Sequence, residues 1–194
     1  MNSLVGCTNI GASHTFILHN FGMRYLSKKL FFVLLLFCSL SAFAKERYSV
    51  RVLPDGNMYF FMPYKLKGSS GTMLQYDMTQ LSYSDSVAIN MTLTSPMGRV
   101  KSIRLFSGEE NYSTTQYELF FQERAGSRFN TRIHIDCPLS KFRRLFSCSV
   151  PLTIELMMED GKHYAFTYKT KTWQKEVSFV SEVQEMIAYS NSRQ

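Results

Sequence analysis

The chain has 194 residues, of which 45% are hydrophobic and 14% aromatic, and its formal net charge is +7 at pH 7. A positive excess of this size does not require a nucleic-acid partner, and we expect none. The length suits one domain with one hydrophobic core once an N-terminal segment has been set aside.

Residues 23–44 have the parts of an export signal in the expected order. A positively charged start, an apolar run and a small-x-small cleavage site follow one another: Arg24, Lys28 and Lys29, then Leu30 to Leu40, then Ala42-Phe43-Ala44. The apolar run is about half the roughly 20 residues of a spanning helix, which favours cleavage near Ala44 over a membrane anchor. We therefore expect a secreted or periplasmic protein with no transmembrane segment after signal cleavage.

Residues 1–22 fit no part of such a signal, and we predict that they are a non-native extension before a start at Met23. Setting aside 44 of the 194 residues leaves 45–194, a single β-rich domain of 150 residues. The first 44 residues hold three basic and no acidic side chains, so the formal charge of the domain falls by three to +4.

Short runs rich in Tyr, Phe, Val, Ile and Thr are separated by Gly, Pro and Asp, which is typical of strands. Four three-residue connections end in glycine and are flanked by such runs: 54–56, 96–98, 124–126 and 159–161. Glycine takes the left-handed last position of this kind of hairpin turn without steric cost. Each connection therefore predicts a hairpin.

The predicted hairpin registers bring apolar side chains into facing pairs. The pairs are Val52–Met58 and Val50–Phe60, Met91–Ile103 and Ile89–Leu105, Phe121–Phe129 and Tyr117–Ile133, and Leu156–Tyr164 and Ile154–Phe166. On the other face of the third hairpin, the same register pairs Glu118 with Arg132 and places His134 opposite Gln116.

Residues 72–83 alternate between apolar and polar types and predict a ninth strand, whereas 106–114 indicates a polar connection. From Trp173 onward, apolar residues recur at helical spacing, with Thr172 as the expected N-cap. Nine strands in about 150 residues need two packed sheets or a closed barrel. We predict a mainly β fold, an antiparallel β-sandwich of about nine strands built from hairpins with one C-terminal α-helix. A closed β-barrel plus helix is the alternative.

Candidate catalytic groups are few in residues 45–194. His134 and Asp136 are two apart on a predicted strand and so share one face, where they could orient a base or begin a metal site. A solvated strand face is the favoured alternative, and exposure after a turn accounts for His163. No nucleophile motif, phosphate-binding glycine loop or third metal ligand at a recognisable spacing accompanies them. We predict no catalytic residue, no metal site and no cofactor.

The segment 137–148, CPLSKFRRLFSC, is the most distinctive polar stretch. Cys137 and Cys148 are an even pair that we expect to form a disulfide after export, worth roughly 3 kcal/mol; two free thiols or half of a metal site are the alternatives. Lys141, Arg143 and Arg144 would point outward if the segment forms a turn of helix. They are the candidate binding residues for an anionic partner such as lipid head groups or acidic glycan, and charges left in water are the alternative.

The sequence thus predicts a non-catalytic exported domain that binds a protein, a glycan or an envelope surface. A lipocalin-type barrel carrying a small apolar ligand is one alternative. A hydrolase whose site is assembled from distant residues, and so is not visible in the sequence, is the other.

Overall fold

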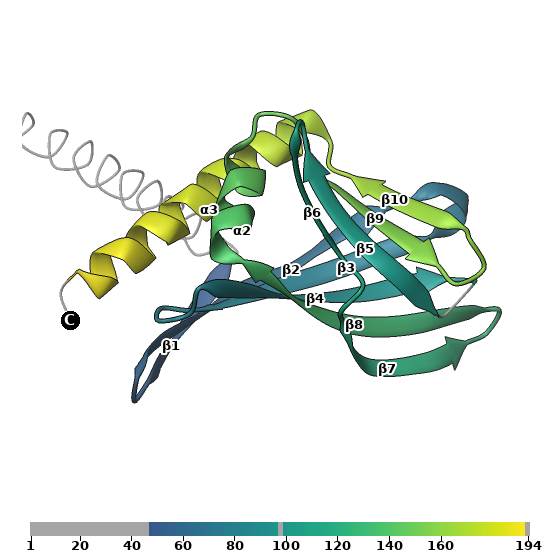
Figure 1. Cartoon of the computed structure of the whole chain (residues 1–194), viewed down its shortest axis with the longest axis horizontal. Helices are drawn as coiled ribbons and strands as arrows, with labels where there is room; N and C mark the ends of the chain where they lie inside the picture. The colour runs from purple at the N-terminus through teal and green to yellow at the C-terminus, as the bar shows by residue number, and fades with distance from the viewer. Residues whose placement is uncertain (1–46, 97–98, 193–194) are drawn as a thin grey trace, which may run out of the picture. The chain divides into compact units, whose positions relative to one another are not determined.

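The computed structural model describes residues 47–96 and 99–192 of the chain (Figure 1). The predicted extension 1–22 and signal peptide 23–44 lie outside the described residues, as do residues 97 and 98 of one predicted turn. Within the described residues, neither α-helix combines the length and apolar character needed to cross a membrane.

The larger of two sheets has six strands in the order β1-β2-β3-β4-β8-β7, and every neighbouring pair is antiparallel. The strands are β1 (Tyr48–Leu53), β2 (Gly56–Lys67), β3 (Met73–Leu81), β4 (Ser86–Ser95), β7 (Glu118–Ala125) and β8 (Arg128–Pro138). A single turn of 3-10 helix, Ser69–Gly71, joins β2 to β3.

The smaller sheet has four antiparallel strands in the order β10-β9-β5-β6. They are β5 (Val100–Ser107), β6 (Glu110–Thr114), β9 (Thr153–Met158) and β10 (His163–Thr167). The two sheets stack face to face (Figure 1) and do not close into a barrel within the described residues. The predicted mainly β sandwich is therefore confirmed, with ten strands in place of about nine, and the barrel alternative is wrong.

Strict alternation along the strands builds the core between the sheets. On β4, every second residue from Val87 to Ser95 is buried, whereas the residues between them are half-buried. Ile103 and Leu105 of β5 are likewise buried from the smaller sheet. Because successive strand residues point to opposite faces, each strand contributes one apolar row to the core. Truncating one of these buried Leu or Ile side chains to Ala should cost about 2–5 kcal/mol.

Two helices, α2 (Leu139–Ser147) and α3 (Thr170–Asn191), lie together at one end of the sandwich (Figure 1). α2 buries Phe142, Leu145 and Phe146 and contacts strands of both sheets. α3 crosses the inner side of β1 and β2, where the Phe179 ring lies 6.1 Å from Tyr48 and 5.9 Å from Phe61, centroid to centroid. The inner face of the larger sheet is thus covered partly by the smaller sheet and partly by the helices.

The predicted C-terminal helix is confirmed, but its expected N-cap is wrong. α3 begins at Thr170 after Lys169, and no side chain caps its first turn. Thr172 lies inside the first turn instead. The N-terminus is held by Trp173, whose indole Nε1–H donates a 2.9 Å hydrogen bond to the carbonyl of Cys148. A buried tertiary contact takes the place of a local cap here.

The hairpin at 159–161 has the predicted register. Leu156 faces Tyr164 and Ile154 faces Phe166. Gly161 has a φ of +81°, the left-handed conformation that the turn requires. Loop length and apolar pattern agree at this site because both strands lie over the core.

The hairpin at 54–56 forms with a register one residue from the prediction. Gly56 already pairs with Leu53, so the connection has two residues and Val52 faces Asn57. The predicted pattern fails because β1 is an edge strand that lies largely outside the core: Val52 is 80% exposed. An apolar pattern sets the register only where a face is buried.

The hairpin at 124–126 also forms with another register. Ala125 pairs with Arg128 across a two-residue turn, so Phe121 faces Arg132 instead of Phe129. A β-bulge between Leu119 and Phe121 then changes the register again, and Glu118 faces His134. The predicted pairs failed because β7 is exposed along its whole length and buries no apolar row.

The predicted hairpin across 96–98 is wrong. β4 pairs with β3 and β8 in the larger sheet, whereas β5 pairs with β6 and β9 in the smaller one. The two strands are consecutive in the chain, but each contributes its apolar row from an opposite side of the core. Facing apolar residues in two layers give the same sequence pattern as facing residues in one hairpin.

One hairpin lies where a polar connection was predicted. β5 and β6 turn tightly at Gly108, whose φ is +60°, and Ser107 pairs with Glu110. A side chain at position 108 would also bring its Cβ within 3.2 Å of the Cys148 sulfur. β6 is polar and has no fully buried residue, so its sequence carries no strand-like apolar alternation.

Candidate binding site at the β7–β8 rim

A row of polar side chains crosses the outer face of the larger sheet. Asp77 on β3 faces Asn90 on β4, Asn90 faces His134 on β8, and His134 faces Glu118 on β7. Asp77, Asn90 and His134 point away from the core because they alternate with buried neighbours on their strands, and Glu118 lies directly opposite His134. The antiparallel register therefore aligns four chemically active side chains from distant parts of the chain.

Hydrogen bonds fix the orientation of the imidazole. The Asn90 amide donates from Nδ2 to Asp77 Oδ1 at 2.8 Å, which leaves Asn90 Oδ1 as an acceptor for His134 Nδ1 at 2.9 Å. His134 Nδ1 therefore carries the hydrogen, and Nε2 points toward Asp136 Oδ2, 3.5 Å away. The Phe120 ring stacks on the imidazole with centroids 5.6 Å apart.

Arg132 balances the charge of Asp77. Its guanidinium lies 2.8 Å from Asp77 Oδ2 and donates a second hydrogen bond to Thr92 Oγ1 at 2.9 Å. Only 4% of the Asp77 side chain is exposed, so this carboxylate is a structural partner of Arg132 and is not available to a ligand. The outer face is thus rigid near its centre and open only toward its rim.

A cleft of about 350 Å³ opens beside His134, between the rim of the larger sheet and β6. Its lining comprises Tyr112, Thr114, Gln116, Tyr117, Glu118, His134, Ile135 and Asp136. Two carboxylates and no Lys or Arg line this cleft. It is a locally acidic site in a chain whose formal net charge is +7.

Two tyrosines form the wall of the cleft. The Tyr112 hydroxyl donates to the backbone carbonyl of Asp136 at 2.7 Å, and the Tyr117 hydroxyl donates to that of Val100 at 2.6 Å. Burial raises the pKa of Tyr112, so its hydroxyl stays protonated as a donor at neutral pH. These bonds tie β6 and the β6–β7 connection to both sheets and hold the cleft open.

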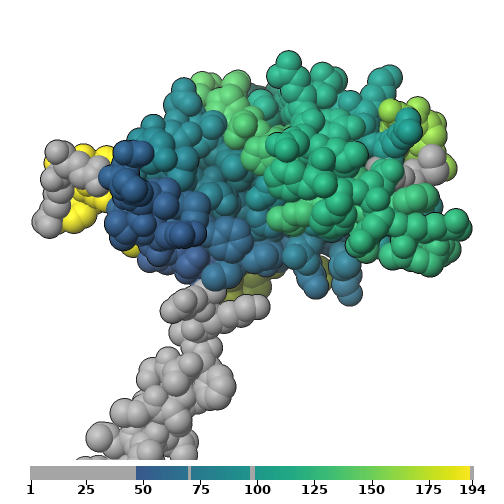
Figure 2. Space-filling model, turned by 90° about the horizontal axis from the view of Figure 1, so that it is seen from below, coloured from purple at the N-terminus to yellow at the C-terminus, as the bar shows by residue number. Residues whose placement is uncertain are grey.

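β7 borders the cleft and is an edge strand with one neighbour, β8. It carries three consecutive exposed apolar side chains: Leu119 is 51%, Phe120 48% and Phe121 40% exposed. Figure 2 shows the molecule from the side of this larger sheet, with β7 in green at its rim. Main-chain groups on the outer side of this strand pair with no other described strand.

The basic residues predicted as a binding site lie elsewhere. α2 presents Arg143 and Arg144 to solvent and half-buries Lys141, on the side opposite to its buried phenylalanines. Arg143 Nε donates to Gln184 Oε1 of α3 at 3.2 Å. The three residues share one helix, and none of them lines the rim cleft.

Cys137 and Cys148 carry free thiols in the structure. They flank α2, and a nine-residue helix is about 13.5 Å long, whereas bridged cysteines need Cα atoms within about 7 Å. The disulfide stays a prediction whose formation requires the ends of α2 to approach each other. Burial raises the pKa of Cys137 to about 12.

The two histidines of the domain lie on different sheets. His163 on β10 has Nδ1 3.4 Å from Glu155 Oε1, whereas His134 belongs to the outer face of the larger sheet. The residues that the structure describes contain no group of three or more His, Cys, Asp or Glu side chains placed to hold a metal ion.

Sequence reasoning found His134 and Asp136 but missed their neighbours Asn90, Glu118 and Tyr112. The predicted register had placed Gln116 opposite His134, and the two-residue turn together with the bulge in β7 places Glu118 there instead. The run Leu119-Phe120-Phe121 beside a charged residue was the available signal, because an apolar run that fits no buried row is a candidate surface.

Comparison with known proteins gives no match: neither protein-family models, nor curated proteins, nor solved structures align significantly with the chain.

Proposed function

We propose that the protein is a non-catalytic exported binding module that holds an extended segment of a partner protein along β7. The observation that carries this proposal is the combination of an open, apolar edge strand with an acidic cleft at its start, Glu118. The segment recognised by this site has a Lys or Arg followed by alternating apolar residues.

An exposed edge strand offers a row of main-chain donors and acceptors to an incoming strand. In strand addition, these groups supply affinity and side-chain pockets supply specificity. Past the bulge, Phe121–Ala125 pairs regularly with β8 and is the stretch that a partner strand can extend. Leu119 and Phe120 lie between this stretch and the cleft, where they would contact apolar side chains of the partner.

The acidic cleft supplies the specificity. Glu118 and Asp136 are exposed carboxylates beside the partly exposed His134, and the Tyr112 and Tyr117 rings stand nearby. A Lys ammonium or Arg guanidinium gains charge-assisted hydrogen bonds from the carboxylates and a cation–π contact from a tyrosine ring. A contact of this small size supports a transient complex rather than a permanent one.

The segment 23–44 supports the exported location. An export signal places the domain where it meets envelope or extracellular proteins. Cell fractionation followed by N-terminal sequencing tests this part: the mature protein should begin near Lys45 and be found outside the cytoplasm. A cytoplasmic product that retains residues 23–44 would refute it.

A displayed library of random peptides tests the binding function. Selection on the purified wild-type protein should enrich peptides with one basic residue followed by alternating apolar residues. The double variant E118Q/D136N should lose the basic preference, and L119T/F121T should weaken binding of selected peptides about tenfold or more. V52T provides the matched control, because Val52 is an exposed apolar residue on the opposite edge strand.

Two outcomes would refute the binding proposal. One is the absence of any enriched peptide family on the wild-type protein. The other is selected peptides that bind both double variants as tightly as the V52T control. Loss of folding does not explain a negative result, since all the replaced side chains are exposed and such substitutions usually change stability by less than about 0.5 kcal/mol.

The basic residues of α2 support a second candidate function, contact with an anionic surface. Arg143 and Arg144 are exposed and make no ion pair with the described carboxylates. Sedimentation with vesicles containing phosphatidylglycerol should pull down the wild-type protein at low salt but not K141Q/R143Q/R144Q. Equal sedimentation of both proteins would end this candidate.

A further inference from the structure

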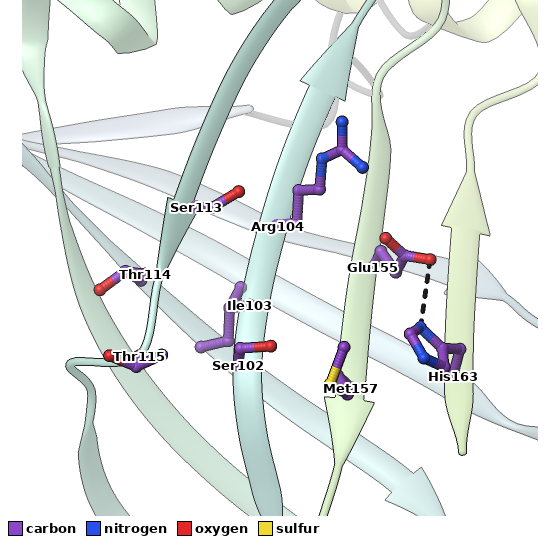
Figure 3. A pocket seen from close by; sticks show the side chains of 9 residues that line it. All are labelled: Ser102, Ile103, Arg104, Ser113, Thr114, Thr115, Glu155, Met157 and His163. Carbon is purple, nitrogen blue, oxygen red and sulfur yellow. Dashed lines mark ion pairs between the residues drawn. The ribbon is translucent and has the colours of Figure 1, made fainter. Parts of the chain in front are cut away.

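A second cavity lies on the outer face of the smaller sheet and shares only Thr114 with the lining of the rim cleft. It has a volume of about 590 Å³, and Figure 3 shows its lining side chains along neighbouring strands of this sheet. Hydroxyl groups predominate in this lining: Ser102, Ser113, Thr114 and Thr115. Arg104, Glu155 and His163 are the ionisable side chains of the lining.

Arg104 occupies the centre of a row across the sheet. It faces Ser113 on β6 and Glu155 on β9. Its guanidinium is turned over the Phe106 ring, 4.9 Å from the ring centroid, and makes no ion pair with any described carboxylate. An exposed arginine that packs against an aromatic face retains N–H donors that can bind an oxyanion.

Glu155 is directed elsewhere. His163 Nδ1 lies 3.4 Å from Glu155 Oε1. His163 is on β10, so it lies beyond Glu155 when viewed from Arg104 (Figure 3). The carboxylate is half-buried and retains an oxygen that can accept from a ligand hydroxyl. The cavity therefore offers a cation for an acidic group at one point, and several neutral donors and acceptors around it.

We infer that this cavity binds a carboxylate-bearing saccharide. A guanidinium pairs with a carboxylate through two parallel hydrogen bonds, which fixes the orientation of the acidic ring. Ser102, Ser113 and Thr115 can exchange hydrogen bonds with ring hydroxyls, and Glu155 accepts one more. The volume falls within the range of small-molecule sites and accommodates one or two sugar rings.

Isothermal titration calorimetry with tri-galacturonate tests the inference. Its fully methyl-esterified form keeps every ring hydroxyl but removes the charge, and inorganic phosphate supplies the charge without the rings. The wild-type protein should bind tri-galacturonate at least about tenfold more tightly than either the ester or phosphate. R104Q should bind tri-galacturonate and ester alike, whereas R51Q, with an exposed arginine on β1 replaced, should behave as wild type.

E155Q gives a second, independent measurement. It should weaken binding of tri-galacturonate and of the ester by a similar factor, because Glu155 is assigned to a hydroxyl and not to the carboxylate. The inference is overturned if the wild-type protein binds no tri-galacturonate, if R104Q binds it as tightly as R51Q does, or if phosphate binds equally well. Failure here leaves the β7 site untouched, because neither Arg104 nor Glu155 lines the rim cleft.

Discussion

At the scale of single residues, Asp77 on the outer face of the larger sheet shows how a carboxylate can be buried. Asp77 keeps the inward–outward alternation of β3, because its side chain points outward from the sheet. The side chain is nevertheless only 4% exposed. The β2 bulge between Phe61 and Tyr64 lies beside it on the neighbouring strand. A buried carboxylate is tolerated because Arg132 and Asn90 satisfy both of its oxygens.

Replacing Arg132 with Gln should therefore destabilise the fold. The variant leaves the Asp77 charge buried without a cation, and the expected loss is about 2–3 kcal/mol in the free energy of unfolding measured in urea. The matched control is R124Q, whose arginine is exposed on β7. D77N in the R132Q background should recover part of the loss. An R132Q variant as stable as R124Q would contradict the assignment.

The two cysteines should differ in reactivity. Cys137 is buried and its pKa is raised to about 12, so almost none of it is thiolate near neutral pH, whereas Cys148 is only half-buried. In the reduced, native protein, iodoacetamide should modify Cys148 and leave Cys137 intact, as read by peptide mass mapping. Equal modification would contradict the burial of Cys137. Resistance of both until reductant is added would instead support the predicted disulfide.

At the scale of elements, α3 is joined to the sheet by a buried ion pair. Glu176 of α3 is buried and pairs with Arg47, the residue before β1. Burial raises the pKa of Glu176 above its ordinary value of 4.5, and Arg47 opposes the rise only in part. The Arg47 guanidinium also lies 3.9 Å from the centre of the Phe179 ring. One contact thus anchors both the first strand and the last helix.

The raised pKa of Glu176 makes a pH-dependent contribution to stability. The folded protein holds the Glu176 proton more tightly than the unfolded chain does, so this contribution is fully present below pH 4.5 and is lost as pH rises through the higher folded pKa. The unfolding free energy of the wild type relative to E176Q should therefore fall as the pH rises from about 4.5 through the raised pKa of Glu176. E182Q, with an exposed glutamate of α3 replaced, is the control. A difference that is flat or rises with pH would contradict this.

Some elements were predictable from sequence and others were not, for a physical reason. β3, β9 and β10 and α3 each place one apolar face on the core, so their patterns carried the information. β6 and β7 bury no apolar row, and their position follows from neighbouring strands and from turns. Two of the residues at the rim cleft, Tyr112 and Glu118, lie on these exposed strands. His134 and Asp136 were found, but their partners depended on a bulge that no periodicity encodes.

At the scale of the whole domain, aromatic side chains at one end of the sandwich link α2 and α3 to the larger sheet. Trp173 packs on Phe146 of α2 and on Tyr168, with ring centroids 5.3 Å and 5.2 Å apart. The Tyr168 hydroxyl in turn hydrogen-bonds that of Tyr76 on β3, and burial raises the pKa of both well above the ordinary value. Sheets and helices therefore share one core.

Unfolding should accordingly be a single transition. Trp173 is the only tryptophan of the chain, so its fluorescence reports the α2–α3 end, whereas far-UV circular dichroism reports the strands and helices together. The two signals should give the same midpoint and slope in guanidinium chloride. A fluorescence transition that precedes the circular dichroism transition would show that the helices detach first.

The bulge between Leu119 and Phe121 also bears on solubility. A long, regular edge strand of exposed hydrophobic residues would allow molecules to pair edge to edge and grow into a fibre. The extra residue divides β7 into two short segments, and Glu123 and Arg124 place charges on the segment after the bulge. A short guest strand can still be accommodated, while an endless stack of copies is disfavoured.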